Sequence, residues 1–144
     1  MPMEAVAEKI SFSAIAPQDI AEFHRQRDKI HAAVIDRIHN TPGMEAIAGD
    51  EEKMRIAHES VKILIENFHA TVKYQLPGAL LDYLDWLRRY LRSRDFPAAF
   101  VASILTSMRN GAHAFLDEYN SDDLGAVLME LRRREERMAE GGAA

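Results

Sequence analysis

The chain has 144 residues, of which 47% are hydrophobic and 28% are charged, and these proportions are ordinary for a globular protein. This length fits one domain with a sizeable core, so wholesale disorder is disfavoured. The net charge of −5 argues against a nucleic-acid partner, and the lack of cysteine excludes disulfides, thiolate metal sites and a cysteine nucleophile.

The sequence contains no evident signal for secretion or membrane insertion. The N-terminal residues MPMEAVAEK include acidic side chains where a signal peptide needs a basic region and an apolar run. No segment approaches the roughly 20 apolar residues that a membrane-spanning helix needs. We therefore expect a cytoplasmic protein that engages neither membrane nor nucleic acid.

The spacing of apolar residues predicts an all-α fold, globin-like or bundle-like, of five to six helices in a single domain over residues 1–140. Residues 141–144 are expected to form a flexible tail. Alternating apolar and polar runs of the kind found in strands do not occur. The predicted helices are Met3 to Ile10, Pro17 to about Asn40, Asp50 to about Gln75, Leu80 to Asp95, Pro97 to Tyr119, and Ser121 or Asp122 to about Glu140.

Residues with strong preferences at helix ends support these boundaries. Pro17 suits the first position of a helix, where its missing N–H costs nothing. Asp50 is a plausible N-cap, because its carboxylate can accept a hydrogen bond from a free backbone N–H of the first turn. Pro77-Gly78 is expected to end the helix that Asp50 begins.

The helix LLDYLDWLRRYLRSRD, residues 80–95, carries the only Trp of the chain. Its charged residues, such as Asp85 and Arg88, lie at helical spacing, which is typical of ion pairs on a solvated helix face. Its leucines and aromatic residues are expected to pack against the neighbouring helices. The predicted interior consists of Phe68, Val72, Trp86, Tyr90, Phe100, Ile104 and Met108.

The last predicted helix has a narrow apolar seam surrounded by charge. The seam consists of Leu124, Val127, Leu128, Leu131 and Met138. A narrow seam suits either packing at the edge of the domain or a parallel coiled coil with a second chain. Both interpretations remain open, and the second makes this helix the expected interaction surface of a homodimer.

Histidines are the first candidates for chemistry, and there are six: His24, His31, His39, His58, His69 and His113. Glu66 and His69 have the Glu-x-x-His spacing of helical di-iron carboxylate proteins, but the further glutamates that such a site needs are missing. Other carboxylate–histidine pairs at helical spacing lack an obvious third ligand. The sequence therefore predicts no metal site, and histidines at the surface or its boundary.

Haem is the alternative, because one axial histidine facing an apolar pocket would suffice. His58, His69 and His113 are the candidates for that ligand. His58 and His69 share a helix face, but they lie ~16 Å apart and cannot both bind one iron. A partly buried histidine bonded to a neighbour is the favoured interpretation, so we expect no cofactor. No phosphate-binding loop, nucleophile elbow or dinucleotide fingerprint is present, and an enzyme is not expected.

The block from His58 to Leu116 resembles the non-haem globin-like sensor domains at the N-termini of stressosome proteins, the RsbT co-antagonist family. The resemblance lies in a long helix, the pattern Tyr-x-x-Trp-Leu-x-x-x-Leu, an Arg-rich turn and a helix that begins near a proline. The same helix pair is also similar to the helical segment that precedes cobalamin-binding domains in bacterial regulators.

The first resemblance implies a homodimeric sensor domain of the stress response that passes a signal through its C-terminal helix to a regulatory protein partner. No ligand residues can be carried over from that family. We therefore expect a sensor or interaction module without catalysis, with a haem sensor or a module of a cobalamin-dependent regulator as the alternatives.

Overall fold

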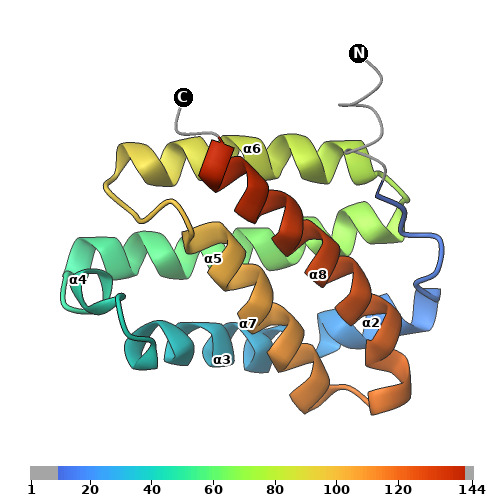
Figure 1. Cartoon of the computed structure of the whole chain (residues 1–144). Coiled ribbons are helices and arrows are strands. Elements are labelled where there is room, and N and C mark those ends of the chain that lie inside the picture. Colours follow the sequence, from blue (N-terminus) through green and yellow to red (C-terminus); the bar gives the residue numbers. More distant parts are fainter. Residues whose placement is uncertain (1–9, 142–144) are drawn as a thin grey trace.

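The structure is a computed structural model that describes residues 10–141, and its fold is all-α (Figure 1). The predicted opening helix from Met3 lies outside the described residues, apart from Ile10. The described helices are α2 (Pro17–Arg25), α3 (Arg27–Asn40), α4 (Glu45–Ala48), α5 (Glu51–Lys73), α6 (Pro77–Ser93), α7 (Phe100–Phe115) and α8 (Glu118–Gly141).

The helices form two layers (Figure 1). In one layer α5 lies between α6 on one side and α2 and α3 on the other. In the second layer α7 and α8 run side by side and cross the first layer obliquely. The core lies between the layers, where α3 and α6 contact α7 and α2 contacts α8. Among the described helices, none has the length and hydrophobicity that a bilayer-spanning segment requires.

Several predicted helix ends are confirmed and others shift. Asp50 is the N-cap of α5, and its Oδ1 accepts a hydrogen bond from the backbone N–H of Lys53 at 3.0 Å. Helix α5 ends at Lys73, before Pro77, and Pro77 instead begins α6, three residues before the predicted start, because proline suits the first helical turn. The last helix begins at Glu118 rather than at a cap at Ser121 or Asp122.

The segment predicted as one helix from Pro17 to Asn40 is interrupted at Gln26, which has φ −92° and ψ 9°. The Arg27 side chain stabilises the break, because its Nη1 donates to the backbone oxygen of His24 at 2.8 Å. The interruption separates α2 from α3. On the two sides of the break, α2 packs against α5 and α8, whereas α3 packs against α5 and α7.

A cluster of four charged side chains joins α6 to α8; Arg134 and Glu135 are buried, and Asp85 and Arg88 are partly exposed. Arg88 Nη1 donates to both carboxylate oxygens of Glu135, at 2.9 and 3.0 Å, and Arg88 Nη2 donates to Asp85 at 2.8 Å. Arg134 Nη1 donates to Glu135 at 3.1 Å, and Arg134 Nη2 lies 3.2 Å from Asp85. Asp85 and Arg88 were expected to pair on a solvated face. They are 29% and 13% exposed, but they also pair with Arg134 and Glu135, which are only 1% exposed.

Candidate functional site

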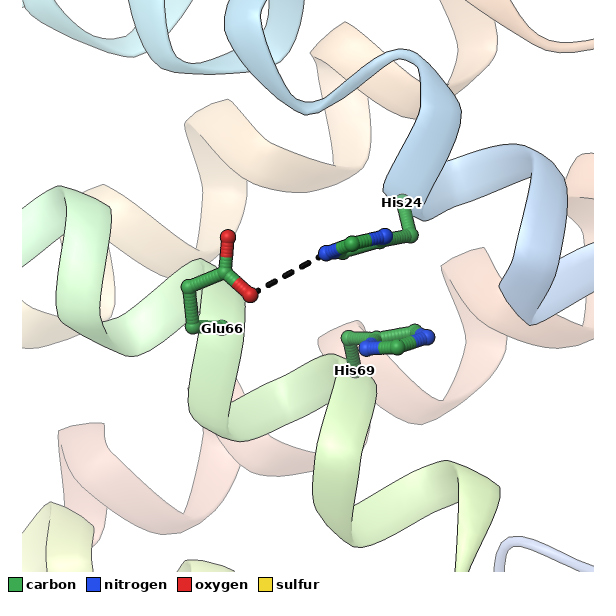
Figure 2. A group of neighbouring side chains, drawn as sticks. All are labelled: His24, Glu66 and His69. Carbon is green, nitrogen blue, oxygen red and sulfur yellow. Dashed lines mark hydrogen bonds and ion pairs between the residues drawn. The ribbon is translucent and has the colours of Figure 1, made fainter.

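Three potential ligand side chains from two helices meet where α2 crosses α5 (Figure 2). His24 comes from α2, while Glu66 and His69 lie one turn apart on α5. His24 Nε2 lies 3.1 Å from Glu66 Oε1, within hydrogen-bonding distance. Each residue offers one nitrogen or oxygen atom, and these three atoms lie within 4.8 Å of one another.

The two imidazole rings lie face to face. Their centroids are 3.9 Å apart and their planes differ by 17° (Figure 2). The preceding residues on the same two helices form a matching pair in the core, since the rings of Phe23 and Phe68 meet edge to face at 5.3 Å. The buried phenylalanine pair therefore sets the register in which His24 and His69 face each other at the rim of the core.

The cluster is accessible from solvent. The side chains of His24 and Glu66 are 31% and 46% exposed. A hollow of about 260 Å³ lies beside Glu66 and is lined also by Arg27, and a second hollow of about 160 Å³ is lined in part by His69. Glu66 and His69 therefore each border a hollow that a small ligand can enter.

Charged neighbours of the cluster pair with Glu66 and affect the pKa of His69. Arg27 Nε lies 3.4 Å from Glu66 Oε2, the carboxylate oxygen that His24 does not contact. Burial, and then the neighbouring His24, lowers the pKa of His69 below its usual value. The nearby Glu66 opposes this shift, whereas Lys73 and Arg27 add to it.

A second histidine pair lies on the same interface, between α3 and α5. His31 Nε2 is hydrogen-bonded to the backbone oxygen of His58 at 3.1 Å, and the two rings are 5.3 Å apart and tilted by 50°. Burial, followed by the neighbouring His31 and His39, lowers the pKa of His58. Four of the six histidines therefore border the interface between α2–α3 and α5, which we call the histidine interface.

The other two histidines belong to neither pair. His39 is exposed near the end of α3. His113 is exposed on α7, and its Nδ1 lies 3.0 Å from Ser121 Oγ. The three histidines considered as axial haem ligands thus occupy three separate surroundings, and only His69 belongs to the three-residue cluster.

Five of the seven residues predicted to line the interior are buried: Phe68, Val72, Phe100, Ile104 and Met108. Trp86 differs from the prediction, because it is 50% exposed on the outer side of α6. Its ring stacks on Tyr90, which is partly buried, at 5.1 Å and 6°. With Ile63 of α5 these rings border a surface hollow of about 190 Å³.

Tyr83 also lines this hollow, and burial raises the pKa of its phenol from 10.0 to about 12. A folded-state pKa above the unfolded value means that the contribution to stability is complete below pH 10.0 and is lost as the pH rises towards about 12. We expect Tyr83→Phe to lose less stability than the wild type over this range, measured by urea unfolding. Equal losses in both proteins would contradict the burial of this phenol.

The seam of the last helix lies inside this chain. Leu124, Leu128 and Leu131 are fully buried and Val127 is 6% exposed, in the core that α8 shares with α7. Met138 is partly exposed. Four of the five seam residues are thus already covered by the protein's own helices.

His24 is the member of the cluster that sequence reasoning missed. The spacing of Glu66 and His69 identifies two ligands on one helix, but the third comes from 42 residues earlier in the chain. The sequence expectation of no metal site rested on the lack of a third ligand, and the packing of α2 against α5 supplies one. The available signal was a histidine directly after a core phenylalanine in both helices, at Phe23-His24 and Phe68-His69.

Comparison with known proteins gave no matching family model, no matching curated protein and no matching solved structure.

Proposed function

We propose that this chain is a non-catalytic regulatory sensor domain in which the histidine interface receives a signal and α8 passes it to a protein partner. One observation carries the proposal: α2, which bears His24, packs against both α5 and α8. A change in the position of α2 on α5 therefore acts directly on α8. The resemblance of residues 58–116 to stressosome sensor domains supports the same function.

The interactions at the cluster are weak enough for a ligand to replace them. A partly exposed pair such as His24 and Glu66 contributes only about 0 to 1 kcal/mol to stability. The phenylalanine pair below it, by contrast, is fully buried and holds the helices together. A ligand at the rim can thus reposition the end of α2 without unfolding the domain.

The last helix is suited to carry the change outwards. Its inner side is fixed to α7 by buried leucines and to α6 by the ion cluster around Glu135. Its outer side carries exposed charges, among them Arg133, Glu136 and Arg137. We propose that this outer side contacts the partner, because the apolar seam is covered within the chain.

The simplest partner is a second copy of the chain. A homodimer would sediment at twice the monomer mass of 16.3 kDa. Reversal of two outer charges of α8, Arg133→Glu with Arg137→Glu, is expected to shift the chain towards monomer. A wild-type protein that stays monomeric at all concentrations in analytical ultracentrifugation would contradict the dimer.

Hydrogen–deuterium exchange tests the route from the histidine interface to α8. His24→Ala removes the contact with Glu66 and the ring stack on His69, and we expect faster exchange in α8 as well as in α2 and α5. His39→Ala, an exposed change near the end of α3, is the matched control and should leave α8 unchanged. The same exchange of α8 in both variants would contradict the proposed function.

A further inference from the structure

We infer that His24, Glu66 and His69 form a binding site for one divalent transition-metal ion of the zinc class. The inference rests on the proposed function in one respect, since it names the ligand of the interface that is proposed to receive the signal. The site itself stands on the convergence of these three side chains from α2 and α5 (Figure 2).

The donor set selects the class of ion. Two imidazole nitrogens and one carboxylate oxygen are a common protein ligand set for zinc and for the first-row metals near it. Calcium and magnesium prefer sites made of oxygen atoms and bind such a set poorly. Three protein ligands leave at least one position for water or a small ligand, which the hollow beside Glu66 can admit.

The distances are close to those that an ion requires. Two ligand atoms bound to one zinc ion, at about 2.0 to 2.2 Å each, lie about 3 to 3.5 Å apart. His24 Nε2 and Glu66 Oε1 already meet this condition at 3.1 Å. The remaining separations, of 4.8 Å or less, can close by rotation of partly exposed side chains.

Arg27 can orient the carboxylate of Glu66. Arg27 Nε lies 3.4 Å from Glu66 Oε2, so it pairs with one carboxylate oxygen, while the other, Oε1, faces His24. Such outer partners orient the ligands of metal sites.

Binding at this site would join two helices that are otherwise held at their rim by weak contacts. The ion would bridge α2 to α5 between residues 42 positions apart in the chain. It would replace the single hydrogen-bonding contact of His24 with Glu66 and separate the stacked rings of His24 and His69. The position of α2 would then depend on whether the ion is bound.

Titration of the chelator-treated full chain with Zn²⁺, and with Co²⁺ as a spectroscopic probe, tests the inference. We expect one equivalent to bind, with calorimetric heat for Zn²⁺ and visible absorption bands for Co²⁺, and no binding of Ca²⁺ or Mg²⁺. His24→Ala, Glu66→Gln and His69→Ala should each weaken binding by at least about 10-fold. Glu66→Gln keeps the shape of the side chain, and circular dichroism of each variant shows whether the fold is retained.

His31→Ala and His58→Ala are the matched controls, because they remove the same residue type from the same interface outside the cluster. They should bind the ion as the wild type does. Absence of Zn²⁺ and Co²⁺ binding would overturn the inference, as would binding that depends on His31 and His58 rather than on the cluster.

The two proposals fail separately. If the ion binds but His24→Ala does not change hydrogen–deuterium exchange in α8, the metal site is supported and the sensor function is contradicted. If His24→Ala speeds exchange in α8 but no ion binds, only the metal site is contradicted.

Discussion

Replacement of Arg88 by methionine is expected to lower the free energy of unfolding by about 3 to 5 kcal/mol, because it removes one partner of a buried ion pair. Glu135, which is 1% exposed, then loses the two hydrogen bonds from Arg88 Nη1 and keeps only Arg134 from this pair of arginines. Burial already raises the pKa of Glu135, so its charged form is costly without Arg88. Urea unfolding of wild type and variant measures the difference.

Two comparisons make this result specific. Arg55 also contacts two carboxylates of its own helix, but it is half-exposed, so Arg55→Met should cost far less stability than Arg88→Met. Arg88→Met combined with Glu135→Leu should recover much of the lost stability, because the buried carboxylate that lost Arg88 is then also removed. Because burial raises the pKa of Glu135, the cost of Arg88→Met should also be larger at neutral pH than at acidic pH, where Glu135 can take up a proton. Equal costs for Arg88→Met and Arg55→Met would contradict the buried cluster.

Helices that are specified by local signals were predictable from the sequence. The apolar spacing along α5 and the carboxylate of Asp50 act within one helix, and the structure confirms both. The break at Gln26 was not predictable in this way, since Phe23 and Ile30 keep a seven-residue spacing across it. Separate packing partners for α2 and α3 decide that break, and these partners lie elsewhere in the chain.

The exposure of Trp86 follows from helical phase. Leu84, Leu87 and Leu91 are buried, and at 3.6 residues per turn Trp86 points roughly opposite to Leu84. The prediction of an interior Trp86 relied on its size and aromatic character instead. Side chains of Trp are commonly part-exposed, and here the ring lies over Tyr83 and Tyr90 at the surface.

The cluster of His24, Glu66 and His69 could be predicted only in part from the sequence. Spacing within α5 brings Glu66 and His69 together, but no property of α5 alone indicates that His24 faces them. That contact depends on the register in which α2 crosses α5. The same limit applies to Arg134 and Glu135, whose burial depends on how α8 lies against α6.

A large loss of stability is also expected from Phe68→Ala, because Phe68 packs where α2 crosses α5. Phe68 is fully buried and its ring meets Phe23 at 5.3 Å and Phe12 at 6.3 Å, both edge to face. Removal of such a ring leaves a cavity and should lower the free energy of unfolding by about 3 to 5 kcal/mol. Ile63→Ala on the same helix is the control, because Ile63 is 49% exposed and should lose far less.

The same substitution connects the core to the site. Since Phe23 and Phe68 set how closely α2 approaches α5, a smaller residue at position 68 should also loosen the contact of His24 with His69. We therefore expect Phe68→Ala to weaken binding of Zn²⁺ although all three ligands are retained, whereas Ile63→Ala should leave it unchanged. Unfolding in urea and metal titration of the same two variants separate the effects. Lost stability with unchanged metal affinity would show that the phenylalanine pair supports the fold but does not position the histidines.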